Sequence, residues 1–115
     1  MDAVDRKLPV DPLLFIQECV RKRQVLWTYH VNMRLKGRFI ERRDILDAVA
    51  SYEIIESYPG DKYLPSYLIL ARAKGKPFHV LFATDLEGGN VRVVTTYRPT
   101  TDEWEADWKT RRSPQ

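Results

Sequence analysis

Histidine and arginine side chains gather in one short segment, residues 29–43, and their types suit a phosphate-bearing partner. On a helix, His30 and Arg34 lie one turn apart on the same face, so an imidazole and a guanidinium can address one target. Between residues 21 and 43 the chain carries eight Lys or Arg side chains and one acid. Such a local cluster favours nucleic-acid binding more than the overall charge of +3 does. The segment predicts a phosphodiester-handling surface, although a solvated cationic helix with no ligand produces the same pattern.

A second histidine and a tyrosine occur later, where apolar residues alternate as they do in strands. His79 shares one face of its strand with Leu81 and Ala83, and a buried, hydrogen-bonded histidine is the simpler interpretation there. Tyr97 stands at the end of the next strand and is followed by Arg98. A tyrosine hydroxyl beside a guanidinium can orient a phosphate and neutralise its charge. An aromatic ring closing the edge of the core explains the same residues.

Composition and spacing argue against several classes of site. The single cysteine, Cys19, cannot form an internal disulfide, and the two histidines lie far apart without paired carboxylates. We therefore expect no metal site and no cofactor. No apolar run approaches the roughly 20 residues that span a bilayer, and residues 1–7 do not resemble a secretory signal. The sequence predicts a cytoplasmic protein without a membrane partner. Cleavage of RNA remains possible without a metal, because RNA supplies its own 2′-hydroxyl nucleophile.

The hydrophobic period changes once along the chain, from helical to alternating. Asp11 followed by Pro12 predicts a helix start, because Asp caps free amides and proline loses nothing at the first helical position. Two further helices are expected at residues 29–36 and 41–51. Strands are then expected at residues 53–58, 67–72, 78–84 and 91–97. The connections between them are short, which forces neighbouring strands to run antiparallel.

A closing helix is predicted after the last strand. Thr100 and Glu103 have the spacing of a capping box, which is typical of a helix start. The expected fold is α+β: N-terminal helices packed on a four-stranded, mainly antiparallel sheet, with a short C-terminal helix. We expect one domain over residues 1–115, with a flexible N-terminus at residues 1–10.

From residue 28 to residue 112 the chain resembles the domain-of-unknown-function 4258 family. The first part of the family pattern is a histidine, an arginine four residues later and an Arg-Gly-Ile element, matched here by His30, Arg34, Arg38 and Ile40. Phe39 stands where the glycine of that element is usual. Further matches are the strand Pro77-Phe78-His79-Val80 and the ending Val94-Thr95-Thr96-Tyr97-Arg98-Pro99.

The resemblance carries expectations about fold, activity and partner. Such domains resemble the RelE/ParE-like toxin superfold, and members of the family are similar to mRNA-cleaving toxins and are often accompanied by a small zinc-ribbon antitoxin. It implies a metal-independent endoribonuclease of the mRNA interferase type. The expected catalytic residues are His30, Arg34, His79 and Tyr97. The expected RNA-binding residues are Arg38, Arg42, Arg43 and Arg98.

Two other readings stay open at this point. The domain could hold RNA or an acidic protein segment on its basic surface without any chemistry. It could also be an inactive relative whose remaining role is to pair with a regulatory partner. One geometric question distinguishes these three hypotheses. It is whether the imidazoles and guanidiniums of the helical N-terminal part and of the strand-forming C-terminal part meet in a single solvent-open hollow.

Overall fold

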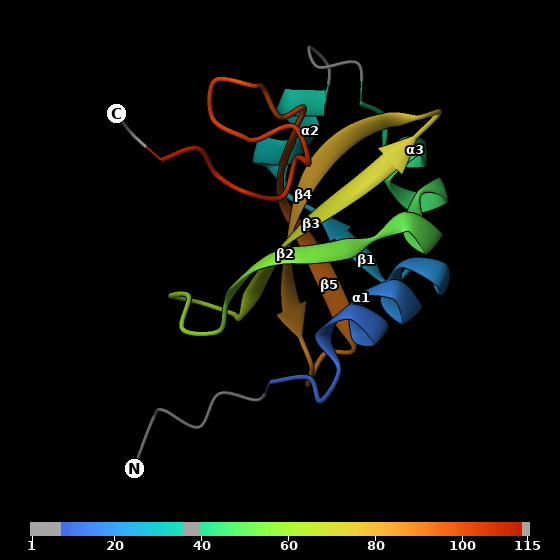
Figure 1. Ribbon diagram of the computed structural model, residues 1–115. Coiled ribbons are helices and arrows are strands. Elements are labelled where there is room, and N and C mark those ends of the chain that lie inside the picture. Colours follow the sequence, from blue (N-terminus) through green and yellow to red (C-terminus); the bar gives the residue numbers. More distant parts are fainter. Residues whose placement is uncertain (1–7, 36–39, 114–115) are drawn as a thin grey trace.

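The computed structural model describes residues 8–35 and 40–113, apart from the side chains of residues 33 and 34. Helices and strands share one compact arrangement, so the predicted α+β class is confirmed (Figure 1). In chain order the elements are α1 (Pro12–Arg21), β1 (Val25–Trp27), α2 (Tyr29–Leu35), α3 (Arg42–Asp47), the 3-10 helix η1 (Val49–Ser51), β2 (Glu53–Tyr58), β3 (Ser66–Ala73), β4 (Lys76–Asp85) and β5 (Asn90–Tyr97).

The sheet has five strands in the order β1-β5-β4-β3-β2. β2, β3, β4 and β5 are joined in sequence and pair antiparallel, as their short connections predict. The additional strand corrects the predicted count of four and makes the sheet mixed. It is β1, which pairs parallel to β5 with Val25 opposite Val91. Three residues give little alternation to read, and the partner strand lies far away in the sequence.

The helix starts follow the capping chemistry of the sequence. At the start of α1 the Asp11 side chain accepts a hydrogen bond from the amide of Leu14, with Pro12 at the first helical position, as predicted. Glu41 caps α3, and the Asp44 carboxylate accepts the Glu41 amide in return. The predicted helix 41–51 is split, because the chain leaves α3 at Asp47 and continues as η1.

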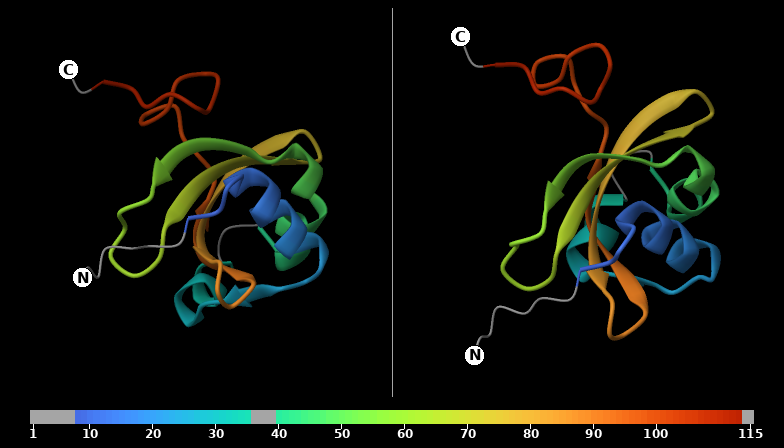
Figure 2. Two further views of the ribbon diagram at one scale, coloured as in Figure 1. Left: turned by 90° about the horizontal axis from the view of Figure 1, so that it is seen from below. Right: turned by 60° about the horizontal axis from the view of Figure 1, so that its bottom comes forward.

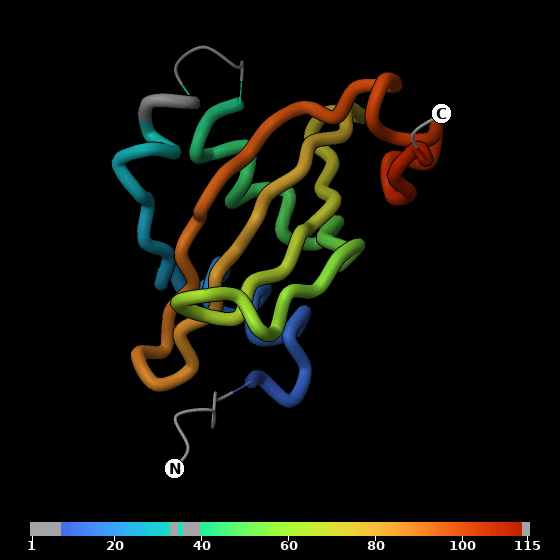
Figure 3. Tube along the Cα trace, turned by 90° about the vertical axis from the view of Figure 1, so that its left-hand side faces the viewer, coloured from blue at the N-terminus to red at the C-terminus, as the bar shows by residue number. Residues whose placement is uncertain are grey.

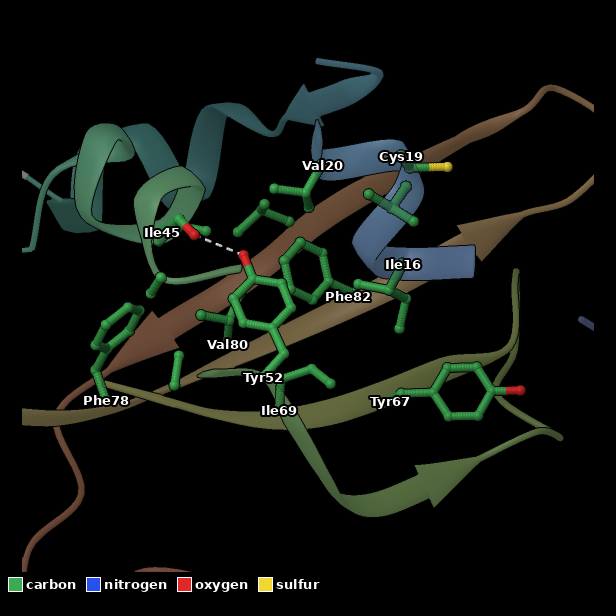
Figure 4. Packing of buried hydrophobic residues seen from close by; sticks show 14 of the residues in the cluster. Ile16, Cys19, Val20, Ile45, Tyr52, Tyr67, Ile69, Phe78, Val80 and Phe82 are labelled. Carbon is green, nitrogen blue, oxygen red and sulfur yellow. Dashed lines mark hydrogen bonds between the residues drawn. The ribbon is translucent and has the colours of Figure 1, made fainter. Parts of the chain in front are cut away.

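The main hydrophobic core lies between one face of the sheet and the helices α1 and α3 (Figures 1 and 2). Strands β3 and β4 contribute alternate residues to it, and α1 contributes Ile16 and Val20, both fully buried (Figure 4). The Tyr52 hydroxyl donates a 2.6 Å hydrogen bond to the carbonyl of Ile45. This bond ties the start of β2 to α3 inside the core.

The predicted C-terminal helix is absent from the described residues. The chain makes one turn here, since the amides of Glu103 and Trp104 both donate to the Thr100 carbonyl. It then turns back, with Trp108 at a φ of 62° and Trp104 paired to Arg111 as an antiparallel bridge. Residues 98–113 therefore form an irregular C-terminal segment that folds over one end of the sheet (Figure 2).

Local and tertiary contacts explain why this segment is not helical. The Asp107 carboxylate accepts hydrogen bonds from the amides of Lys109 and Thr110, which favours a turn over a continuing helix. Trp104 is 1% exposed and lies against the sheet, so burial of its large side chain decides the path of the backbone. None of the helices in residues 8–35 and 40–113 is long and apolar enough to cross a membrane.

Candidate functional site

The sheet face opposite the helices is only partly covered, and we call it the open face (Figure 3). Strand pairing arranges its residues in cross-strand rows. One row aligns Leu70, His79 and Tyr97, and the next aligns Leu68, Leu81 and Thr95. The last row aligns Ser66, Ala83 and Arg92. The C-terminal segment covers the first row, and the other rows border open hollows.

Two β-bulges decide which polar side chains reach the open face. In β5 one extra residue, Val94, lies between the residues opposite Phe82 and Leu81. Counting from the hairpin without it would pair His79 with Thr96, and would turn Tyr97 toward the helices. The bulge moves the register by one residue and places Tyr97 opposite His79.

The bulge in β2 acts in the same way. Ile55 is the extra residue, between Ile54 opposite Ile69 and Glu56 opposite Leu68. Counted from the connection to β3, Glu56 lies opposite Leu68 on the open face before the bulge is reached, so the shift acts on the residues that precede it. It places Ile54 on the core face and Glu53, opposite Leu70, on the open face. Both bulges thus bring polar groups from the two sides of the sheet to the same surface.

His79 is fully buried beneath the C-terminal segment. Its Nε2 lies 2.8 Å from the carbonyl oxygen of Trp108, and its Nδ1 lies 3.2 Å from the hydroxyl of Tyr97. A carbonyl can only accept, so Nε2 carries the proton, and the Tyr97 hydroxyl donates to Nδ1 of the neutral ring. Trp104 packs edge-on against the imidazole, with ring centroids 4.5 Å apart. Burial is the main cause that lowers the pKa of His79, which favours the neutral form.

Arg111 and Glu56 form a two-point ion pair at the border of this region. Arg111 donates from Nε to Oε2 of Glu56 at 2.6 Å and from a terminal nitrogen to Oε1 at 3.0 Å. The hydroxyl of Tyr58 also donates to Glu56. The hydrogen bond from Arg111 is the main cause that lowers the pKa of Glu56, so the carboxylate is ionised at neutral pH. The Arg111 guanidinium lies 4.5 Å from the ring centroid of Trp104, which holds it in place.

A solvent-open hollow of about 370 Å³ lies over the second row. Arg111, Tyr97 and Tyr58 line it together with Asp61, and Leu68, Leu81 and Thr95 complete its lining. We call it the Tyr97 hollow. Its size is in the range of pockets that hold small ligands, and its apolar floor with a few convergent polar groups is typical of a binding site.

Tyr97 brings a neutral hydroxyl to the lining of this hollow. Burial is the main cause that raises the pKa of Tyr97, to about 12, so its hydroxyl stays protonated at neutral pH. Arg111 supplies positive charge on the same lining, and only two of its five N–H donors are used by Glu56. The hollow therefore combines a cation with a neutral hydroxyl whose proton is donated to His79, and an ionised carboxylate lies beside them.

The structure separates the predicted catalytic residues. His79 and Tyr97 are hydrogen-bonded to each other, but the ring of His79 is buried and does not open into the hollow. His30 is exposed on α2 and is not part of the lining. The two imidazoles therefore do not share one solvent-open hollow. Arg34 lies on α2, and its side chain is outside the described part of the structure.

The predicted RNA-binding arginines with described side chains make contacts within the chain. Arg42 donates to the side-chain oxygen of Asn32 at 2.6 Å and lies 5.0 Å from the ring centroid of Trp27. Arg43 pairs with Glu41 at 3.8 Å, and Arg98 donates to the carbonyl of Pro77 at 3.3 Å. Arg38 lies outside the described residues.

Sequence reasoning missed three members of the site. Glu56 and Tyr58 were part of a strand with no assigned role, and Arg111 was assigned to the end of a helix. A two-residue spacing of Glu and Tyr in a strand places both on one face, which was a usable signal. Their pairing with Arg111 joins residues 55 positions apart, and no local pattern predicts it. In the part of the chain that the structure describes, no three His, Cys, Asp or Glu side chains are grouped to hold a metal ion.

The model of one protein family, described as Domain of unknown function (DUF4258), matches residues 27–98. The match includes His79 and Tyr97 and also both bulges, and it ends before the residues that supply Trp104 and Arg111. No curated protein and no solved structure matches the chain.

Proposed function

The chain belongs to the DUF4258 family, and from its open sheet face we propose that it is a metal-independent endoribonuclease acting on mRNA. We further propose that it is the toxin of a toxin–antitoxin pair. One observation carries the enzymatic proposal: Tyr97 and Arg111 line one solvent-open hollow, and buried His79 fixes the Tyr97 hydroxyl from behind.

The proposed reaction uses Tyr97 and Arg111 from the lining of the hollow, and Glu56, which borders the hollow through its ion pair with Arg111. The 2′-oxygen of the RNA attacks phosphorus while the bond to the 5′-oxygen breaks, which leaves a 2′,3′-cyclic phosphate and a free 5′-hydroxyl. The ionised carboxylate of Glu56 accepts the 2′-hydroxyl proton, and the Tyr97 hydroxyl turns from Nδ1 of His79 and donates its proton to the departing 5′-oxygen. Arg111 stabilises the charge that develops on the phosphate oxygens.

His79 is a positioning residue in this scheme. Its Nε2–H is fixed by the Trp108 carbonyl, so its Nδ1 can only accept, and this determines where the Tyr97 oxygen sits. An exposed histidine acting directly as the base would have to be His30. The two assignments differ in outcome, because His30→Ala leaves our reaction intact and abolishes a reaction that depends on that imidazole.

The test is cleavage of a single-stranded RNA in the presence of EDTA, by the protein alone and with translating ribosomes. We expect products ending in 2′,3′-cyclic phosphate, and none from the same RNA with a 2′-deoxy substitution at the cleaved position. Tyr97→Phe should lower kcat by roughly 10²–10⁴-fold, in the range of general acid catalysis. Tyr29→Phe is the matched control, since Tyr29 is 80% exposed and does not line the hollow. Full activity of Tyr97→Phe, or intact RNA with folded wild type, contradicts the proposal.

The toxin role is tested by expression in cells. Wild type should arrest growth and Arg111→Gln should not, because a missing charge stabiliser costs roughly 10²–10³-fold in rate. Co-expression of a small zinc-ribbon antitoxin should restore growth. Arrest by Arg111→Gln at equal protein level would show that toxicity arises elsewhere.

A second candidate is a non-catalytic module that binds RNA or protein. It is favoured by the Tyr97 hollow, because the described residues of its lining include no histidine and Glu56 already pairs with the guanidinium of Arg111. This reading gives binding without turnover. For RNA it also gives affinity that falls steeply with salt.

A further inference from the structure

A second hollow lies on the open face next to the Tyr97 hollow, and its volume is about 400 Å³. Its floor is formed by the row Ser66–Ala83–Arg92, in which Ser66 and Ala83 have small side chains. The neighbouring row carries the larger Leu68 and Leu81. Ser66 and Ala83 are buried at the bottom. The connection between β2 and β3, residues 59–65, forms one wall and crosses in front of the strands (Figure 3).

The wall presents an aromatic ring to solvent. Tyr63 is 82% exposed, although tyrosine usually buries much of its ring. The ammonium of Lys62 lies 5.3 Å from the centroid of this ring. Arg92 lines the opposite side and pairs with Asp85 at 3.2 Å, which uses one of its donors. An exposed ring flanked by cations is the arrangement that binds single-stranded nucleic acid, with bases stacked on aromatics and phosphates near the cations.

The two hollows share one lining residue. Asp61 lines both of them, and its carboxylate accepts a hydrogen bond from the Ser66 hydroxyl, which fixes it where they meet. The rows that form the two floors are neighbours, two residues apart along β3 and β4 and three along β5, where the bulge adds Val94. That spacing is roughly 7 Å, so groups bound over adjacent rows can belong to consecutive nucleotides of one strand.

We infer that the second hollow binds the nucleoside next to the cleaved phosphodiester, with its base stacked on Tyr63 and its phosphate near Lys62 and Arg92. This inference rests on the proposed function, since it names where the same RNA strand continues. The carboxylate of Asp61 faces both nucleosides and accepts hydrogen bonds from a base that carries N–H donors. The site therefore reads at least two nucleotides rather than a single phosphate.

The test is the binding of a fluorescein-labelled RNA hexamer in which every ribose is 2′-O-methylated, so that the nucleophile is blocked. Tyr63→Ala should weaken binding about tenfold, within the range measured for one stacked base. Tyr29→Ala is the matched control, because this tyrosine is 80% exposed and lines neither hollow. Arg92→Gln should also lower the dependence of affinity on salt by about one phosphate contact, and Arg21→Gln should not.

Kinetics separate this inference from the proposed function. With cleavable RNA, Tyr63→Ala should raise KM about tenfold and leave kcat unchanged, whereas Tyr97→Phe lowers kcat. Cleavage by wild type with an unaltered KM for Tyr63→Ala overturns the second hollow alone. Equal losses for Tyr63→Ala and Tyr29→Ala place the RNA elsewhere and overturn it too. Failure of the wild type to bind the hexamer at all overturns both proposals.

Discussion

The two faces of the sheet are built from the same strands but do different work. On the helix-covered face, alternate residues of β3 and β4 such as Ile69 and Phe82 are fully buried and apolar. On the open face the intervening positions combine leucines with His79, Tyr97 and Glu56, and hollows remain between them. The packing of the helix-covered face contributes most to the stability of the domain, and the open face holds polar groups in fixed positions.

In this sheet the type of a side chain does not by itself decide the face on which it lies, because the bulges change the register. Strict alternation from the connections between the strands would put Glu53 and Tyr97 on the helix-covered face, where an unpaired carboxylate is costly. Each of the two bulges reverses the alternation beyond it. Substitutions on the helix-covered face should therefore lower stability more than RNA cleavage, and substitutions on the open face should lower RNA cleavage more than stability.

The largest effect is expected from adjacent residues of β4 that point to opposite faces. Phe82→Ala should lower the free energy of unfolding by ~3–5 kcal/mol, because it removes a fully buried ring and leaves a cavity. Leu81→Ala, on the half-buried open face, should cost less than ~2 kcal/mol. Urea denaturation of both variants measures this difference. Equal losses would mean that the open face is as much a core as the helix-covered one.

A smaller effect is expected for His79, the polar residue most deeply placed on the open face. His79→Gln should cost ~1–3 kcal/mol at neutral pH, since it disturbs two buried hydrogen bonds. The folded-state pKa lies below the ordinary value of about 6.5, so the unfolded chain binds more protons. The contribution of His79 to the free energy of unfolding is therefore fully present above pH ~6.5, and it is lost as the pH falls through the folded-state pKa.

The pH dependence gives this prediction its own control. Denaturation at several pH values between about 5 and 7.5 should show a steeper decrease for wild type than for His79→Gln, which cannot titrate there. His30→Gln should keep the wild-type slope, because that residue is exposed. Parallel curves for wild type and His79→Gln would show that the buried imidazole does not contribute to the slope.

The ion pairs that fasten the C-terminal segment to β2 should give about 1 kcal/mol or less. Arg111→Gln removes the two-point pair with Glu56 and the contact with Trp104, and should cost ~1 kcal/mol. Lys109→Gln removes a single, more exposed contact with Glu53 and should cost less than ~0.5 kcal/mol. Thermal unfolding compares the two, and a larger loss for Lys109→Gln would contradict this ranking.

The smallest effect is expected in the basic segment, far from the open face. The side chain of Arg43 is 76% exposed, so Arg43→Gln should change stability by less than ~0.5 kcal/mol. Arg42→Gln should cost slightly more, because Arg42 bonds to Asn32 and lies over Trp27. RNA cleavage by both variants should stay within about twofold of wild type. A loss of RNA cleavage above tenfold in Arg43→Gln would indicate that the RNA binds on this segment instead.

Much of the fold was predictable because its determinants are local. The cap at Asp11 depends on its own sequence, and the hairpin between β4 and β5 depends on the Gly-Gly turn that joins them. The prediction failed where distant residues decide. The apolar run of β1 can be a brief strand or an extended link from its sequence alone, and its pairing with β5 makes it a strand. The helix predicted after Thr100 was wrong, because the Trp104 side chain is buried on His79.

The candidate site was predictable only in its ingredients. Tyr97 was chosen from its position at a strand end, and His79 from its type. Their hydrogen bond depends on a bulge that no turn or charge pattern announces. The basic segment attracted attention through charge density, but the structure uses Arg42 to join α3 to α2 and β1. Charge density predicts where cations occur, and it does not predict what they contact.

The C-terminal segment makes the integrity of the site an all-or-none property. The same few residues shield His79 from water through Trp104 and supply the only guanidinium among the described residues that line the Tyr97 hollow. A protease cut, a bulky tag or a competing protein that lifted this segment would solvate the histidine and withdraw the cation in a single event. Displacement of residues 98–113 would then remove the proposed activity while the sheet stays folded.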